Sequence, residues 1–291
     1  MNENWSRFVQ GVNTLYSSRV LRFDDCFFEQ FVNAFQLDRE KRLKILEIGC
    51  GPGALAGAMH RWYPKAEIVA MDLDSAFIRF AKENEAGITF VEGDARDLPF
   101  ENESFDVTIS NTVSEHIEPN AFFGQQKRVL KKGGVCLVLS ARKGYRQKSC
   151  FETETEFEIN FWKKVSEFDD SMERFSVGKY AMSEKTLPRT MQEMGFHKIS
   201  TAYAVSNLTP DNEGVSREMA IDMINAGRHN DLEAIKSVWE TMPERVTREE
   251  IDEMTRLANR KYDLRIQKYL SGEKEWDTNV SITMIARGVK M

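Results

Sequence analysis

The stretch ILEIGCGPGALA, Ile45–Ala56, decides the fold of this 291-residue chain. It contains the end of a continuous apolar run, LKILEI at 43–48, which is typical of a strand buried on both faces. Glycines end the run, and GALAGAMHRW at 53–62 follows with small residues where a helix must approach a sheet. The sequence therefore predicts a buried strand, a glycine loop and a helix in direct succession.

Strand and helix patterns continue to alternate after this unit. Helices are expected over 75–86 and near 121–131. Strands separated by helix-length segments imply right-handed crossovers and a parallel sheet, so we expect an α/β fold. The expected strands are EIVAMD at 67–72, ITFVEG at 88–93, FDVTIS at 105–110 and VCLVLS at 135–140.

The two flanks of this region are mainly helical in pattern. Upstream, 24–35 carries phenylalanines at helical spacing, which indicates an amphipathic helix packed on the sheet. Downstream, an aromatic stripe could belong to the core or to a substrate lid; its residues are Phe157, Phe161, Val165 and Phe168. A helix is expected over 183–194 and strands over 198–205 and 276–288. Three helices are expected between those last strands, at 216–226, 231–242 and 247–270.

Composition and charge limit the classes of molecule that the protein is expected to bind. The chain is 41% hydrophobic and 30% charged, with a net charge of -6 and no basic block, which disfavours nucleic acid. No apolar run reaches the roughly 20 residues of a membrane helix, and MNENWSRF does not resemble a signal peptide. The four cysteines show neither paired nor metal-like spacing. We expect a cytoplasmic protein with free thiols and no membrane partner.

The glycine loop could bind one of two adenosine cofactors. Gly49, Gly51 and Ala54 fit the dinucleotide pattern G-x-G-x-x-G/A, which alone is weak evidence. Asp72 ends the next strand, where a carboxylate can accept both ribose hydroxyls of NAD or of adenosylmethionine. Glu47 favours adenosylmethionine over NAD, because a carboxylate repels a pyrophosphate but attracts the ammonium and sulfonium of adenosylmethionine.

The motifs LEIGCGPG, MDLD, GDARDLPF, SFDVTIS, EHI and RVLKKGG together resemble the class I S-adenosylmethionine-dependent methyltransferases. They span roughly 40–140, and they are most similar to small-molecule enzymes of the ubiquinone/menaquinone-biosynthesis type. The resemblance implies a Rossmann-like sheet of seven strands in the order 3-2-1-4-5-7-6, with the last strand antiparallel. The strand at 276–288 would be the seventh.

The same resemblance implies a division of the chain and a cofactor site. One domain would span 1–291, with an N-terminal helical segment (1–40), a cofactor-binding core (41–145), a helical lid segment (146–182) and a helical insertion between the sixth and seventh strands (209–272). The cofactor would be S-adenosyl-L-methionine, with S-adenosyl-L-homocysteine as product and no metal. The implied contacts are Glu47, Gly49, Cys50 and Gly51 at the methionyl end, Asp72 on the ribose, Leu73, Asp94 and Ala95 at the adenine, and Asn111 near the methionine.

The roles of the residues on the acceptor side follow less directly from the sequence. Glu115 and His116 would face the methyl acceptor, and His116 is the first candidate for a general base and Glu115 the second. His116 could equally be a packing or surface residue. Arg19 and Arg22 could grip the methionyl carboxylate or an acidic acceptor, or be solvated.

The function expected from these residues is methyl transfer from adenosylmethionine to a small molecule. SNTV at 110–113 replaces the N/D-P-P-Y motif of adenine and amide N-methyltransferases. A non-catalytic adenosylmethionine-binding or scaffold protein remains the alternative, and an NAD oxidoreductase or an RNA or protein methyltransferase is disfavoured. The acceptor atom is left open, as is a homodimer formed through apolar stripes in the insertion.

Overall fold

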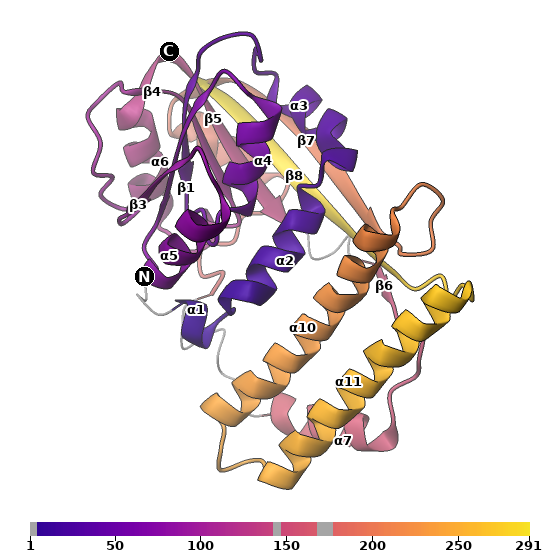
Figure 1. Ribbon diagram of the computed structural model, residues 1–291. Helices are drawn as coiled ribbons and strands as arrows, with labels where there is room; N and C mark the ends of the chain where they lie inside the picture. The colour runs from indigo at the N-terminus through magenta and orange to yellow at the C-terminus, as the bar shows by residue number, and fades with distance from the viewer. Residues whose placement is uncertain (1–4, 142–146, 168–176) are drawn as a thin grey trace.

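A mixed β-sheet with helices on both faces forms the centre of the computed structural model, which describes residues 5–141, 147–167 and 177–291 (Figure 1). Five parallel strands lie in the order β3 (Thr89–Glu92), β2 (Glu67–Asp72), β1 (Lys44–Ile48), β4 (Phe105–Asn111) and β5 (Leu130–Ala141). β8 (Thr278–Lys290) runs antiparallel beside β5, and β7 (Phe196–Leu208) pairs with the other side of β8. With β7 and β8 as sixth and seventh strands, the predicted order 3-2-1-4-5-7-6 is confirmed.

A short additional strand was not predicted from the sequence. β6 (Gln147–Ser149) pairs antiparallel with the beginning of β8, on the side that β5 also occupies. It lies outside the seven-strand pattern.

Successive residues of the central strands point to opposite faces of the sheet and enter two different cores. Ile45 lies in the cluster under α3 (Phe28–Phe35), α4 (Ala54–Trp62) and α5 (Ser75–Asn84), whereas Leu46 lies in the cluster under α6 (Pro119–Val129) and α9 (Thr186–Glu193). All five helices overlap helices expected from the sequence. Strands with both faces covered must be apolar throughout, which explains why their runs were recognisable.

The insertion between β7 and β8 is a pair of long antiparallel helices, α10 (Arg217–Thr241) and α11 (Arg248–Ser271), which extends away from the sheet (Figure 1). The prediction of two separate helices at 216–226 and 231–242 is wrong, because α10 is continuous. Gly227 is not a break: a Cβ there would lie 2.9 Å from a ring carbon of Tyr262, so glycine lets α11 approach closely. Thr247 and Glu250 form a capping box at the start of α11.

A third cluster of buried residues fills the far end of this helix pair. Phe161 and Val165 of α7 (Glu156–Ser166) pack against Ile235, Val238 and Met254 of the pair. Phe161 and Val165 of the aromatic stripe are therefore core, whereas Phe157 is exposed. Phe168, the last residue of the stripe, lies outside the described residues, as do 142–145 of the predicted core and 146 and 168–176 of the predicted lid segment.

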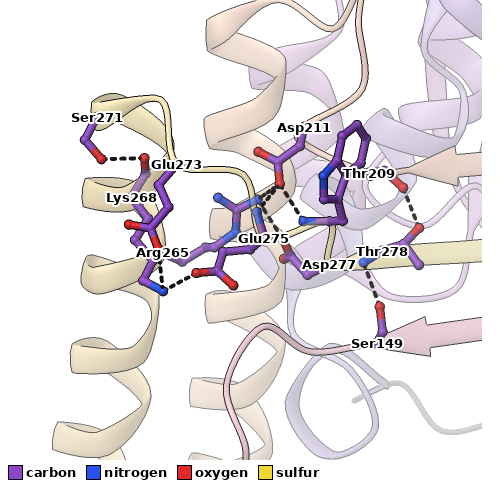
Figure 2. A network of polar contacts seen from close by, with 11 residues as sticks. Ser149, Thr209, Asp211, Arg265, Lys268, Ser271, Glu273, Glu275, Asp277 and Thr278 are labelled. Carbon is purple, nitrogen blue, oxygen red and sulfur yellow. Dashed lines mark hydrogen bonds and ion pairs between the residues drawn. The ribbon is translucent and has the colours of Figure 1, made fainter.

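The helix pair is also joined to the sheet. Met223 of α10 belongs to the same core cluster as Ile45, and α10 packs along α2 (Val12–Arg22), a helix within the predicted N-terminal helical segment for which no bounds were predicted. At the other end, Arg265 of α11 donates from Nε to Asp277 Oδ1 at 2.7 Å and from Nη2 to Asp211 Oδ2 at 2.6 Å (Figure 2). The insertion is thus anchored to the ends of β7 and β8.

No helix in the described part of the chain is long and apolar enough to cross a membrane.

Candidate active site

A cavity of about 630 Å³ opens at the carboxyl ends of the parallel strands. Its base is formed by the loops that follow β1, β2, β3 and β4 and by the end of β5. Its other walls come from the N-terminal segment, α2 and residues 177–184. This is the edge of an open α/β sheet where ligands bind.

The glycine loop after β1 forms one wall of the cavity. Gly49 has φ 69°, and a Cβ there would lie 2.4 Å from Val113 Cγ2, so a side chain is excluded by both backbone and space. Its N–H donates to Met71 O at 2.7 Å, and the N–H of Gly51 donates to Asp72 Oδ2 at 2.8 Å. The loop after β1 is thus held against the end of β2.

Asp72 is fixed by backbone donors on both sides. Besides Gly51, the N–H of Asp74 donates to Asp72 Oδ1 at 2.9 Å. Burial raises the pKa of Asp72 to about 6, with a further rise from the Asp74 charge, while the N–H donors oppose the increase. Asp74 caps α5 and also accepts from the N–H of Ser6 at 2.8 Å, which ties the N-terminal segment to the cavity.

Glu47 is the least compensated charge of the site. Its side chain is 2% exposed, and Oε2 has no hydrogen-bond partner among the described residues. Burial raises the pKa of Glu47 well above its usual range, and the nearby Asp72 carboxylate raises it further, whereas the N–H of Ala56 opposes the shift. A cation in the cavity would favour the charged form of both carboxylates.

Arg19 projects from α2 into the opposite side of the cavity. Its Nη2 donates to Thr112 Oγ1 at 3.2 Å, and Thr112 has φ 56°, a strained conformation for a β-branched residue. Burial lowers the pKa of Arg19 and the Glu115 charge opposes this, so the guanidinium stays charged. Arg22 does not line this cavity but lines a smaller one between α2 and α10.

His116 is held by the segment on the other side of the cavity. The N–H of Gly178 donates to His116 Nδ1 at 3.0 Å, and the Trp5 ring meets the imidazole edge-on with centroids 4.8 Å apart. The N–H of Tyr180 donates to Glu115 O at 2.8 Å. Because Nδ1 accepts a proton donor, the neutral ring inferred from this bond carries its own proton on Nε2.

Part of the sequence that builds this cavity matches a known protein family. Residues 46–138 match the family model described as a methyltransferase domain. Residues 46–138 thus form a methyltransferase domain. The resemblance inferred from the motifs is thereby confirmed.

Two curated relatives match this methyltransferase domain. The fatty-acid O-methyltransferase of Mycolicibacterium smegmatis is 40% identical over 116 residues, which are 38% of this chain and 42% of that protein. The probable phthiotriol/phenolphthiotriol dimycocerosates methyltransferase 2 of Mycobacterium ulcerans is 42% identical over 95 residues, 31% of this chain and 36% of that protein. The chain thus matches only about two fifths of the length of these relatives.

Structural similarity to a known protein covers more of the chain than the sequence match at 46–138 does. A solved structure of Haemonchus contortus phosphoethanolamine N-methyltransferase 2 in complex with S-adenosyl-L-methionine covers 100% of this chain, with a TM-score of 0.53 and 18% identity. The chain covers 60% of that structure. At this identity the likeness concerns the fold alone.

Most of the residues predicted for the site line the cavity of the methyltransferase domain. They are Arg19, Glu47, Gly49, Cys50, Gly51, Asp72, Leu73, Ala95, Asn111, Glu115 and His116. Asp94 is not among the lining residues: its carboxylate pairs with Arg96 Nη2 at 2.5 Å, and that bond lowers the pKa of Asp94. The described residues contain no group of three or more His, Cys, Asp and Glu side chains that could hold a metal ion.

The N-terminal side of the cavity's cover was not predicted from the sequence, whereas Met182 falls within the predicted lid segment (146–182). Trp5, Val9, Gln10 and Leu15 line it from the N-terminal side, and Met182 lies on the facing segment. Only Thr14 and Leu21 of α2 are buried, so this helix shows little apolar periodicity. The spacing of Leu15 and Arg19, one helical turn apart, is the signal that could have indicated a shared face.

Proposed function

We propose that the protein is an S-adenosylmethionine-dependent methyltransferase that acts on a small-molecule acceptor. The observation that carries the proposal is the pair of buried carboxylates at the glycine loop. Glu47 Oε2 lacks a partner in the described structure and faces the same cavity as Asp72. A carboxylate pair with one unpartnered oxygen suits a ligand with a cationic end, such as the ammonium and sulfonium of adenosylmethionine, and is unfavourable for a pyrophosphate.

The other cavity residues complete a site for this cofactor. Asp72 would accept from the ribose hydroxyls, and Leu73 and Ala95 would contact the adenine. Arg19 is charged and buried and would bind a carboxylate, either that of the methionyl group or that of an acidic acceptor. Asp94 would join the adenine contacts only by leaving Arg96.

When bound, adenosylmethionine supplies a methyl carbon already activated by its sulfonium. The residues of this chain then need to hold the acceptor in line with that carbon and to exclude water. Trp5, Val9 and Leu15 on one side and Met182 on the other form an apolar cover suited to this role.

His116 would contact the acceptor as a hydrogen-bond donor. Its Nδ1 accepts from the N–H of Gly178, so a hydrogen bond to the acceptor would be donated by Nε2–H. His116 remains the first candidate for a base only if Gly178 releases Nδ1 and the ring changes tautomer. Glu115, which lines the same cavity, is the second candidate.

The acceptor we propose has a substantial apolar part. The two curated relatives are named for fatty-acid and dimycocerosate substrates, and the apolar cover described above suits a molecule of that character. The acceptor atom is not specified by these residues.

Calorimetry with adenosylhomocysteine and NAD tests the cofactor. We expect micromolar affinity, on the order of -8 kcal/mol, for adenosylhomocysteine and no heat with NAD. Transfer of a labelled methyl group from adenosylmethionine to fatty acids and to a small-molecule extract then tests the activity. Heat with NAD alone would overturn the proposal, and cofactor binding without transfer to any acceptor would favour a binding or scaffold protein.

A further inference from the structure

Helix α2 presents two arginines to two different cavities. Arg19 lines the first cavity, of about 630 Å³, which is the candidate active site. Arg22, three residues later, lines a second cavity of about 80 Å³ between α2 and α10. The two residues have the same side chain on the same helix, and Arg19 is the one that lines the active site.

Arg19 is a cation that no carboxylate of the described residues neutralises directly. It lies deep enough in the protein for burial to lower its pKa, yet it keeps some exposed surface and lines the first cavity. Its hydrogen bond to the described residues runs from Nη2 to Thr112 Oγ1. Glu115 acts on it through its charge, but no ion pair joins these two described residues. Because a charge in such a place is costly unless it is paired, Arg19 suits an anionic ligand.

Two contacts of α2 place Arg19 on the acceptor side of the first cavity. Leu15, one turn earlier, covers the glycine loop, since a Cβ on Gly51 would lie 3.2 Å from Leu15 Cδ2. Arg19 instead reaches the loop after β4, where Thr112 is four residues before His116. The methionyl end of the cofactor would lie at the glycine loop, so the anion that Arg19 binds belongs to the acceptor.

Thr112 holds the Arg19 guanidinium from a fixed position. Its φ of 56° is a strained conformation for a β-branched residue, and its N–H donates to Leu139 O of β5 at 2.8 Å. The next residue, Val113, occupies the space that a Cβ on Gly49 would need. The loop after β4 therefore packs against both β5 and the glycine loop, and its Thr112 hydroxyl orients Arg19.

His116 supplies a second hydrogen-bond donor on this side. Its Nδ1 accepts from the N–H of Gly178 at 3.0 Å, so the proton of the neutral ring is on Nε2. The guanidinium of Arg19 has donors and no acceptor. Two donors suit an acceptor that is already an anion, because a hydroxyl or ammonium group would need a base to remove its proton.

We propose that Arg19 binds a carboxylate of the methyl acceptor and that this carboxylate is methylated to an ester. The inference rests on the proposed function and names the acceptor class: a carboxylic acid with an apolar chain. A carboxylate oxygen would attack the methyl carbon, and the bond from that carbon to sulfur would break with its electron pair kept by sulfur. The products are a methyl ester and adenosylhomocysteine. No proton is released, because a carboxylic acid is ionised at neutral pH.

Three acceptors of one chain length test the acceptor class. The unmodified protein, saturated with adenosylhomocysteine, is titrated by calorimetry with octanoate, octanol and octylamine. Octanoate should bind roughly 10- to 100-fold more tightly than octanol, as expected of hydrogen bonds to a charged group, and octylamine should bind more weakly than either. With labelled adenosylmethionine, methyl octanoate should be the main product.

Substitutions of the two arginines test the residue. Arg19→Met should weaken octanoate binding by about 10- to 100-fold and leave adenosylhomocysteine affinity within about threefold. Arg19→Lys keeps the charge without the planar fork and should retain part of the octanoate affinity. Arg22→Met is the matched control on the same helix and should change neither affinity.

Substitutions of Thr112 test its positioning role. Thr112→Val keeps the branched shape but loses the hydroxyl, so KM for octanoate should rise by about threefold to tenfold with unchanged adenosylhomocysteine affinity. Thr112→Ser keeps the hydroxyl and should stay close to the unmodified protein. Equal KM values for the two variants would show that the hydroxyl does not position Arg19.

The outcomes separate this inference from the proposed function. Tighter binding of octanol or octylamine than of octanoate, or no methyl octanoate from a protein that binds adenosylhomocysteine, would overturn the inference. A loss of about tenfold or more in adenosylhomocysteine affinity in Arg19→Met would also overturn it, because Arg19 would then bind the methionyl carboxylate. Failure of the unmodified protein to bind adenosylhomocysteine would instead overturn the proposed function.

Discussion

Two buried charged sites, one at the glycine loop and one at the base of the insertion, are built in opposite ways. Glu47 lies beside a second carboxylate, with one oxygen unpartnered in the described structure. Arg265, fully buried, is bonded to two carboxylates, Asp211 and Asp277 (Figure 2). Like charges buried together are costly without a ligand, whereas a buried cation between carboxylates needs none. The difference separates a site that awaits a ligand from one that holds the scaffold.

The largest effect is expected from breaking the scaffold site. Arg265→Ala would leave the buried Asp211 and the half-buried Asp277 without their cation, so the free energy of unfolding should fall by about 3–5 kcal/mol. Urea unfolding measures this change. Arg256→Ala on the same helix is the control, because the pair of Arg256 with Glu253 is solvent-exposed and its loss should hardly move the midpoint. Similar midpoints for the two variants would contradict the comparison.

Substitution of His116 tests the acceptor side of the ligand site. If Nε2–H positions the acceptor through a hydrogen bond, His116→Ala should lower kcat by about 10²-fold with little change in cofactor affinity, because the acceptor is no longer held in line with the methyl group. His116→Asn keeps an oxygen for the N–H of Gly178 and an N–H for the acceptor, and should recover at least tenfold.

A base would behave differently in the same experiment. His116→Asn would then be as slow as His116→Ala, and an acidic limb near pH 6.5 in the profile of the unmodified enzyme would disappear in both. Near-normal turnover of His116→Ala would show that His116 contributes only packing contacts.

Asp72 tests whether the carboxylate pair binds the cofactor. Asp72→Ala should weaken adenosylhomocysteine binding by about 1.5–3 kcal/mol, because a hydrogen bond to a charged group is lost. Titration calorimetry measures the change, with Glu92→Ala at the end of the neighbouring strand β3 as the control. An unchanged affinity for Asp72→Ala would place the ribose elsewhere.

The raised pKa of Asp72 gives a pH dependence of a definite sign. Burial raises this pKa to about 6 in the free protein, so the folded state holds the proton more tightly than the unfolded state. Stability from this group is therefore greatest below the unfolded pKa and declines as pH rises toward 6. Because the charged carboxylate binds the ribose, cofactor affinity should do the reverse, increasing between pH 5 and 7. A flat affinity profile would contradict the assignment.

The two regions also differ in how far the sequence could predict them. β1 and β2 were found within a residue because buried parallel strands are continuous apolar runs, and Gly49 marks a backbone that excludes side chains. The insertion was misread at Gly227, since a glycine needed for contact with Tyr262 looks the same in sequence as one that ends a helix.

Helix α2 was not delimited from the sequence for a related reason. Its function depends on single residues such as Leu15 and Arg19 that face a cavity, and a helix that covers a ligand need not carry an apolar stripe. Likewise, the pairing of Asp94 with Arg96 depends on the conformation of one loop, which no spacing rule encodes.

The smallest effect we predict concerns the contact through which the insertion holds α2. Gly11, the residue before α2, has no side-chain cap, and its N–H instead donates to Glu233 Oε1 of α10. The Thr14 hydroxyl adds a bond of 3.5 Å to His229 O of the same helix. A carboxylate at a helix N-terminus stabilises the first turn, and loss of such a cap costs about 0.5–2 kcal/mol. Glu233→Ala should therefore weaken adenosylhomocysteine binding by up to about tenfold, because α2 carries Leu15 and Arg19 into the cavity.

Hydrogen exchange distinguishes this local effect from a general loss of stability. In Glu233→Ala, amides of Val12–Arg22 should exchange faster while those of α11 keep their rates. Glu233→Gln retains an oxygen that accepts from Gly11 and should restore most of the binding, and Lys236→Ala, on the exposed side of α10, should have no effect. If Glu233→Ala binds adenosylhomocysteine normally and α2 stays protected, then the insertion does not act on the first cavity through α2.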